Sequence, residues 1–279
     1  MTNEQEPQLN KNLDVDQIRA FAQQGDMNAQ YLLGELLRTG EGMEPDLAES
    51  ARWYRAAAQQ GHVWAANNLG LMLHNGAGVE QDFKEAAHWF KRAADQGLAE
   101  AQSNLALLYC GGHGVRQDFK EANRLFTLAA GEGLAEAQNS LGGLHFHGHG
   151  VERNFLEAAR WYEEAAGNGH SGAAYNLALM FYNGHGVRRD FNRALSLFEE
   201  AAEGGTAEAA YNIGVMYQNG SGVKLDEERA VEWFYRAGQI YLANGMREPA
   251  SEAASAIESC IAGHPLAQKL LAEIFGENE

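Results

Sequence analysis

Small and apolar residues recur along this chain at a fixed interval of 36 residues. A series of glycines and a series of alanines keep that interval through six copies: Gly25, Gly61, Gly97, Gly133, Gly169 and Gly205, and Ala29, Ala65, Ala101, Ala137, Ala173 and Ala209. A third series consists of Gly-x-Gly pairs that begin at Gly40, Gly76, Gly112, Gly148, Gly184 and Gly220. Because the three series stay in phase without an insertion, the sequence predicts six structural repeats, from 25–60 through 205–240.

Each repeat contains two runs of apolar residues with helical spacing. In the repeat 61–96, Ala65, Leu69 and Leu73 lie four residues apart, which predicts a first helix, named here helix A. The Gly-x-Gly pair that follows predicts the end of helix A, since glycine readily adopts the positive φ of a helix C-cap. A second apolar run over 86–94 predicts helix B. Each repeat is therefore expected to be a helical hairpin.

Helix B is expected to begin at an acidic capping box. Asp82 is a good N-cap residue, and Glu85 three residues later completes the box. The same two positions hold Asp46 and Glu49, Asp118 and Glu121, and Asn154 and Glu157. In the fifth and sixth repeats Arg193 and Arg229 replace the glutamate, so the box is lost there.

A small residue in helix A faces a bulky pair in helix B in every repeat. The small position holds Gly34, Gly70, Ala106, Gly142, Ala178 and Gly214. The bulky pairs are Trp53-Tyr54, Trp89-Phe90, Leu125-Phe126, Trp161-Tyr162, Leu197-Phe198 and Trp233-Phe234. Small against large lets antiparallel helices interdigitate, and one hairpin cannot bury its apolar face alone. The sequence therefore predicts an all-α fold, a right-handed α-solenoid of stacked antiparallel helix pairs.

Every copy of the repeat carries a recognisable motif. In the repeat 61–96 it is formed by Ala65, Leu69, Gly70, Gly76, Gly78, Val79, Asp82, Ala86, Trp89, Phe90, Ala93 and Ala94. This motif resembles the Sel-one-like repeat family, a branch of the tetratricopeptide superfamily, over about residues 25–240. The resemblance implies a scaffold for protein complexes, often in bacterial signalling, envelope or host-interaction contexts. Secreted family members staple each repeat with a cysteine pair. This chain has only Cys110 and Cys260, so it departs from them.

The two ends of the chain differ from the repeats. The predicted organisation is a disordered N-terminus at 1–12, an N-terminal capping helix at 13–24, six Sel-one-like repeats at 25–240, and a tetratricopeptide-like closing unit with a C-terminal cap at 241–279. Pro249 and Pro265 are each expected at the first position of a helix, where proline is favoured.

The acidic composition narrows the range of partners. The chain has 21 Lys and Arg against 38 Asp and Glu, a formal charge of −17. This charge repels phosphate backbones, so nucleic acid is not expected as a partner, whereas a protein or peptide with basic segments is favoured. No apolar run approaches the roughly 20 residues of a membrane span. With two cysteines and a polar N-terminus, the sequence favours a cytoplasmic protein that is not bound to a membrane.

No motif in the sequence makes a convincing catalytic site. The Gly-x-Gly pairs follow helices rather than strands, so they are interpreted as turns and not as phosphate cradles. The chain is therefore expected to be no enzyme and to need no cofactor. One alternative is a metal-binding or hydrolytic site formed by His145, His147 and His149, which His113 could join. Cys110 has no close basic neighbour that would lower its pKa, so it is interpreted as a half-buried structural residue.

Three columns of helix A positions are expected to line the concave face, by analogy with tetratricopeptide domains. The first holds Asn28, Trp64, Glu100, Glu136, Gly172 and Glu208; the second Tyr31, Asn67, Ser103, Asn139, Tyr175 and Tyr211; the third Arg38, His74, Cys110, Phe146, Tyr182 and Gln218. Aromatic residues are favoured as interface anchors. The candidate partner-binding residues are therefore Trp64, Asn67, His74, Phe146, Tyr175, Tyr182 and Tyr211.

Two further alternatives remain open from the sequence. A polar helix A position recurs with the repeat and holds Asn68, Asn104, Ser140, Asn176 and Asn212. These side chains either hydrogen-bond a neighbouring helix or clamp the backbone of a bound peptide. The whole chain could also be a structural subunit of a larger assembly, bound through its convex face or its C-terminal cap.

Overall fold

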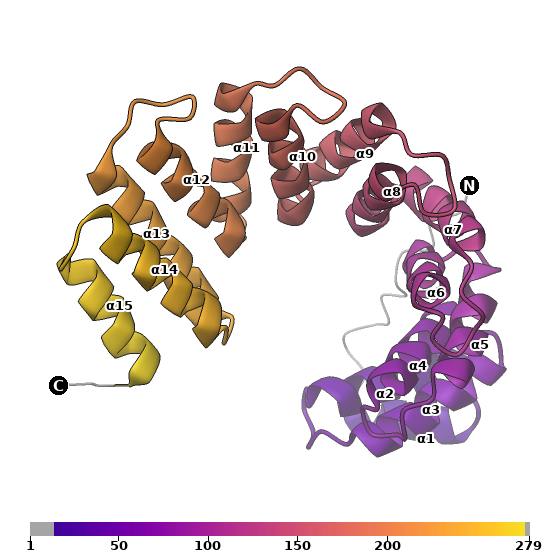
Figure 1. The fold of residues 1–279 in the computed structure, drawn as a ribbon. Coiled ribbons are helices and arrows are strands. Elements are labelled where there is room, and N and C mark those ends of the chain that lie inside the picture. The colour runs from indigo at the N-terminus through magenta and orange to yellow at the C-terminus, as the bar shows by residue number, and fades with distance from the viewer. Residues whose placement is uncertain (1–13, 277–279) are drawn as a thin grey trace. The chain divides into compact units, whose positions relative to one another are not determined.

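The computed structural model describes residues 14–276 and shows an all-α protein, with no strand within this range (Figure 1). Its helices are α1 (Val15–Gln23), α2 (Met27–Thr39), α3 (Leu47–Gln59), α4 (Val63–Asn75), α5 (Phe83–Ala94), α6 (Ala99–Gly111), α7 (Phe119–Gly131), α8 (Ala135–His147), α9 (Phe155–Gly167), α10 (Ser171–Asn183), α11 (Phe191–Glu203), α12 (Ala207–Asn219), α13 (Glu227–Ala243), α14 (Arg247–Cys260) and α15 (Pro265–Phe275). The even-numbered helices α2–α12 are the A helices, and each pairs with the B helix that follows it. The predicted α-solenoid of helix pairs is confirmed.

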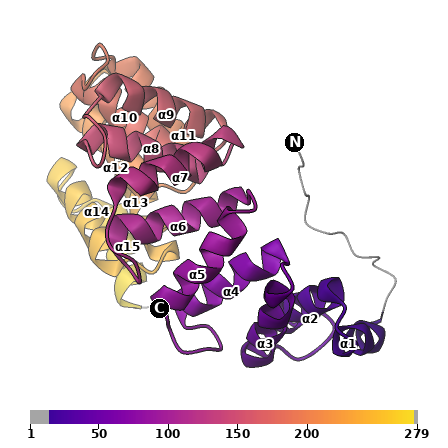
Figure 2. The same ribbon diagram turned by 90° about the vertical axis from the view of Figure 1, so that its right-hand side faces the viewer.

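The chain divides into two compact units. Unit 1 contains α1–α7 together with residues 149–151, and unit 2 runs from Gln138 in α8 to the end of α15, apart from those three residues. Within each unit, A and B helices alternate and consecutive helices pack against one another (Figures 1 and 2). The predicted disordered segment 1–12 lies outside the described residues.

The two glycines of each Gly-x-Gly pair serve different purposes. Gly76 has φ 68° and ends α4 as a left-handed C-cap, a conformation that glycine adopts without strain. Gly78 lets the turn approach the previous repeat, because a Cβ there would lie 2.4 Å from the carbonyl carbon of Leu47 at the start of α3. One glycine therefore ends the helix, and the other allows neighbouring hairpins to stack.

In the capping boxes predicted at the starts of the B helices, the N-cap side chain bonds the first turn, but the glutamate does not bond back to the N-cap backbone. Asp82 accepts hydrogen bonds from the backbone N–H groups of Lys84 and Glu85, both at 2.9 Å, as predicted. The Glu85 side chain instead accepts from the indole Nε1 of Trp89 at 3.1 Å and from Arg55 of the previous B helix. The Glu85 carboxylate reaches these partners because Trp89 lies one turn later in α5 and Arg55 lies in the preceding B helix. A reciprocal box is found at α1, between Asp14 and Gln17.

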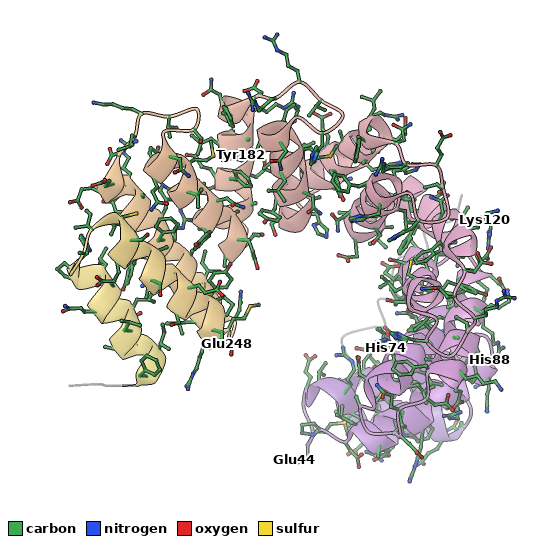
Figure 3. All side chains as sticks on the ribbon, in the orientation of Figure 1. Glu44, His74, His88, Lys120, Tyr182 and Glu248 are labelled. Carbon is green, nitrogen blue, oxygen red and sulfur yellow. The ribbon has the colours of Figure 1, made fainter. Side chains whose placement is uncertain are left out.

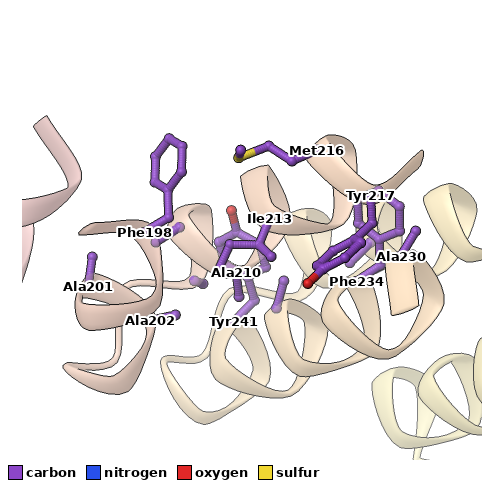
Figure 4. Packing of buried hydrophobic residues seen from close by; sticks show 14 of the residues in the cluster. Phe198, Ala201, Ala202, Ala210, Ile213, Met216, Tyr217, Ala230, Phe234 and Tyr241 are labelled. Carbon is purple, nitrogen blue, oxygen red and sulfur yellow. The ribbon is translucent and has the colours of Figure 1, made fainter. Parts of the chain in front are cut away.

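The small positions of the A helices contact the rings of the B helices, as the sequence predicted. A Cβ placed on Gly34 would lie 2.7 Å from the ring of Tyr54, and one on Gly142 would lie 2.5 Å from the ring of Tyr162. Gly70 and Gly214 meet Phe90 and Phe234 in the same way. Figure 4 shows one of these regions in unit 2, where Phe198, Tyr217 and Phe234 pack among alanines of α11–α13. The core of each unit therefore consists of large rings seated against small residues.

The C-terminal helices close unit 2 by the same device. A Cβ on Gly238 of α13 would lie 2.3 Å from the side chain of Leu270, so α15 packs closely against α13. Pro265 occupies the first turn of α15 as predicted, but α14 begins at Arg247, which places Pro249 at its third position rather than its first.

Candidate functional site

The side of the A helices that holds the three predicted columns, named here the A face, carries four columns of residues rather than three. The positions of Asn28, Tyr31, Glu35 and Arg38 in α2 are separated by three or four residues, so they lie along one side of the helix. The column of Glu35 was missed in the sequence and continues with Leu71, Leu107, Gly143, Leu179 and Val215. Helical spacing alone would have identified this column, since it falls midway between the second and third.

In unit 1 the missed column supplies the most exposed apolar side chains of the A face. Leu71 is 37% and Leu107 47% exposed. Trp64 is half-buried on the same side of α4. Together these three residues form an apolar strip on α4 and α6.

His74 and Asn67 contribute less to this strip than the sequence suggested. His74, which is labelled in Figure 3, bonds Asn75 through Nδ1 at 3.0 Å and meets the ring of Phe83 edge-on at 5.2 Å. Asn67 is only 4% exposed, and its Oδ1 accepts a hydrogen bond from Asn104 Nδ2 at 3.0 Å. Asn67 therefore serves the packing of α4 against α6 and offers a partner only the edge of its side chain.

The recurring asparagines link successive A helices. Asn104 donates to Asn67 of the preceding A helix, Asn176 donates to Asn139 at 3.0 Å, and Asn212 donates to the hydroxyl of Tyr175 at 3.3 Å. In each pair the partners are 37 residues apart, and both are at most half exposed. These bonds favour the structural interpretation of the asparagines over the peptide clamp.

At α2 the A face of unit 1 is a closed polar network. Arg38 donates to Glu35 at 2.6 Å and to the hydroxyl of Tyr54 at 3.2 Å, and Asn68 donates to Glu35 at 2.7 Å. Tyr54 also donates to Glu35. Burial raises the pKa of Tyr54, and its bond to the Glu35 carboxylate raises that pKa further. The network is internally satisfied, so the strip on α4 and α6 is the part of this face best suited to contact a partner.

In unit 2 four of the sequence-predicted residues are aromatic and lie on the A helices α8, α10 and α12. Phe146, Tyr175, Tyr182 and Tyr211 are all half-buried. Each ring is backed by a ring of a B helix, with centroid distances of 5.1 Å for Phe146–Phe155, 5.8 Å for Tyr175–Phe198, 5.2 Å for Tyr182–Phe191 and 4.9 Å for Tyr211–Phe234. Such backing fixes the rings, so a partner would order few side chains on binding.

Acidic residues surround the last of these aromatic residues. Burial raises the pKa of Tyr211, and the charge of Glu252 raises it further. Burial likewise raises the pKa of the nearby Tyr241 to about 12, with Glu208 the next contributor. A shallow hollow of about 640 Å³ lies between α12 and α14. It is lined by Tyr211, Gln218, Glu248, Ser251, Glu252, Ser255, Ala256 and Ser259. This lining contains two carboxylates and no basic side chain.

The histidines of the turns pack on phenylalanines. His113 stacks on Phe83 at 5.2 Å, and His185 stacks on Phe155 at 5.7 Å. His149 stacks on Phe119 at 4.8 Å. In each pair the phenylalanine is the first residue of the preceding B helix, so these rings help neighbouring hairpins to stack.

The remaining histidines of the proposed metal site lie in α8. His147 meets Phe146 edge-on at 5.1 Å, and His145 is half-buried, with its Nδ1 enclosed and without a hydrogen-bond partner. Within residues 14–276, no three or more His, Cys, Asp or Glu side chains are grouped as a metal would require.

Both cysteines are half-buried free thiols. Burial raises the pKa of Cys110 and of Cys260, which keeps each thiol protonated and poorly nucleophilic at neutral pH. Gln218 Nε2 lies 3.2 Å from the sulfur of Cys260. This environment agrees with a structural role for Cys110.

The helices between residues 14 and 276 are each too short or too polar to cross a membrane.

Comparison with known proteins identifies the repeat. The profile described as "Sel1 repeat" matches residues 28–62, 65–98, 99–134, 135–170, 171–206 and 207–239. A protective antigen of uropathogenic Escherichia coli with an SLR fold is similar at 30% identity and a TM-score of 0.77, over 95% of this chain. This chain spans only 58% of the length of that antigen. A Sel1 repeat protein from Oxalobacter formigenes is similar at 28% identity and a TM-score of 0.73, over 88% of this chain and 96% of the other. No curated protein matches the chain.

Proposed function

Because the chain belongs to the Sel1 repeat family, whose solenoids are generally scaffolds for protein–protein interaction, we propose that it is a non-enzymatic adaptor that binds a protein or peptide on its A face. The observation that carries this proposal is the row of half-buried rings in unit 2, each backed by a B-helix ring. Aromatic residues held in this way resemble the anchors that dominate interface energies.

The charge of the same face favours a partner with basic segments. The hollow beside Tyr211 holds Glu248 and Glu252 without a basic residue, and the whole chain carries −17. A lysine or arginine of the partner would meet carboxylates and a tyrosine ring there, which together favour a cation. The apolar strip of Trp64, Leu71 and Leu107 offers a second contact area on unit 1.

The proposal is tested by affinity purification with the tagged full-length chain, followed by the double variant Tyr175→Ala/Tyr182→Ala. We expect the variant to lose the captured partner, with at least a tenfold weaker Kd against the purified partner, because hot-spot aromatics each contribute about 2 kcal/mol or more. The circular dichroism spectrum and the melting temperature check that the helices remain folded.

The matched control removes exposed apolar side chains that lie off the A face. Leu156 is 61% and Leu225 56% exposed, so Leu156→Ala/Leu225→Ala is expected to retain the partner. Unchanged capture by the tyrosine variant would refute the A face as the binding surface. Failure to capture any saturable partner would refute the adaptor itself.

A further inference from the structure

A hollow of about 500 Å³ at the turn edge of the fifth repeat gathers basic side chains in an otherwise acidic chain. Its lining includes Phe181 at the end of α10, Arg188 and Arg189 in the turn, and Asp190, Phe191 and Arg193 at the start of α11. Three arginines therefore face one aspartate in a chain whose overall charge is −17. The hollow belongs entirely to unit 2.

Aromatic rings hold two of the three guanidinium groups. The guanidinium carbon of Arg193 lies 4.4 Å from the ring centroid of Phe181, and that of Arg189 lies 5.2 Å from the centroid of Phe191. Stacking restricts the motion of both side chains. Arg193 already donates to Glu163 through Nη2, so Arg189 is the stacked guanidinium group whose N–H edges remain open to a ligand.

The charge of the hollow is only partly compensated by the protein. Asp190 is engaged as the N-cap of α11, where its Oδ1 accepts from the backbone N–H of Arg193 at 3.0 Å. Glu163 of α9 pairs with Arg193. Arg188 and Arg189 are exposed and have no acidic partner among the described residues. Two guanidinium groups thus remain available to an anion.

The fifth repeat is the one that has a basic residue at all three positions. The same positions hold Glu44, Pro45 and Glu49 in the first repeat, Glu80, Gln81 and Glu85 in the second, Arg116, Gln117 and Glu121 in the third, Glu152, Arg153 and Glu157 in the fourth, and Lys224, Leu225 and Arg229 in the sixth. Arginine in the first turn of a helix opposes the helix dipole, whereas glutamate is favoured there. The first two repeats have no basic residue at these positions and their helices still pack on one another, so stacking of the hairpins does not require three arginines.

We propose that this hollow binds the carboxylates of an acidic protein segment. The planar guanidinium fork matches a carboxylate through two parallel hydrogen bonds. A short segment can place its carboxylates at the hollow and neutral residues elsewhere. A nucleic acid carries charge at every step and would be repelled by the acidic remainder of the chain. The hollow adjoins the A face at Phe191, whose ring also backs Tyr182, whereas a cation is favoured beside Tyr211, so unit 2 offers recognition surfaces of opposite sign.

The test uses the full-length chain and a fluorescein-labelled peptide rich in glutamate, followed by fluorescence anisotropy. We expect saturable binding that weakens with added salt, and at least a tenfold higher Kd for Arg188→Glu/Arg189→Glu. Arg193 is left intact because it contacts Glu163 and Phe181. The variant's melting temperature is expected to stay close to that of the wild type.

The matched control is Lys84→Glu/Lys120→Glu, which makes the same change in net charge at exposed second positions of α5 and α7 (Figure 3). It is expected to change the Kd less than twofold, and so is Tyr211→Ala on the A face. Absence of peptide binding by the wild type, or an equal loss in the lysine control, would overturn the proposal. Tighter binding of a single-stranded oligonucleotide than of the peptide would overturn the assignment to a protein segment.

Discussion

Arg193 pairs with Glu163 across 30 residues, in the arrangement that joins Arg55 to Glu85, but with the two charges exchanged. Arg19 and Glu49 keep the orientation of the Arg55 pair, at 3.0 Å. The aromatic neighbours of this position also differ between Glu85 and Arg193. Glu85 accepts from the indole of Trp89, whereas Arg193 stacks on Phe181 and has Leu197 in place of the tryptophan. Each orientation of the ion pair is thus matched to its own set of aromatic neighbours.

Reversing the charge of one residue of such an ion pair should lower the free energy of unfolding more at Glu85 in unit 1 than at Arg193 in unit 2. Glu85→Arg loses the ion pair to Arg55, the bond from Trp89 and a favourable charge at the start of α5, which together favour a loss of about 2 kcal/mol. Arg193→Glu loses its pair and its stacking but gains the favourable helix-terminal charge, so about 1 kcal/mol is expected. Chemical unfolding monitored by circular dichroism measures both. Equal losses would contradict the dependence on the aromatic neighbours.

Gly142→Ala should destabilise unit 2 because the new methyl group meets the ring of Tyr162 at 2.5 Å. Displacing a buried ring costs roughly 1–3 kcal/mol. The control Gly131→Ala adds a methyl group where nothing lies within 4 Å, at a glycine without a positive φ, and is expected to be neutral or slightly stabilising. Adding Tyr162→Leu to Gly142→Ala should recover part of the loss in thermal unfolding. If Gly142→Ala proves as stable as the wild type, the close packing of α8 on α9 is wrong.

His62 should make unit 1 sensitive to mild acid. Its Nδ1 accepts from the backbone N–H of Ala65 at 3.1 Å, its ring stacks on Tyr31 at 4.3 Å, and burial lowers its pKa to about 4. The folded state therefore binds fewer protons than the unfolded state. The contribution of His62 is complete above the ordinary pKa of about 6.5 and is lost as the pH falls through 6.5 towards 4, by at most about 3 kcal/mol.

The acid sensitivity is measured by comparing the free energy of unfolding at pH 7 and pH 4.5 for the wild type and His62→Asn. Asparagine retains an N-cap acceptor but does not titrate in this range. We expect the variant to lose less stability than the wild type between the two pH values. Identical losses would show that His62 does not titrate in the folded chain as its burial implies.

The sequence by itself determined the six hairpins, their helix ends and the small-against-large packing of the core. These features depend on local spacing and recur with the 36-residue period. Gly76 ends a helix because glycine adopts a positive φ without strain. Gly70 faces Phe90 because the small position and the ring position are each repeated at that interval. For the same reason the aromatic positions of the A face in unit 2, such as Tyr182 and Tyr211, could be identified before the structure.

Only the tertiary structure decided which side chains are used within the stack and which remain accessible. Asn67 is buried against α6, Glu85 bonds a tryptophan and the previous B helix rather than its own helix end, and His113 stacks on Phe83. The basic hollow forms mainly within one hairpin, from α10, the turn and α11, and stacking adds only Gly222 of the next repeat to its lining. The period of the sequence determines which face of its helix a residue occupies. The residue that it contacts belongs to an adjacent hairpin, about 30 residues away in these cases, and the packing of the hairpins determines which residue that is.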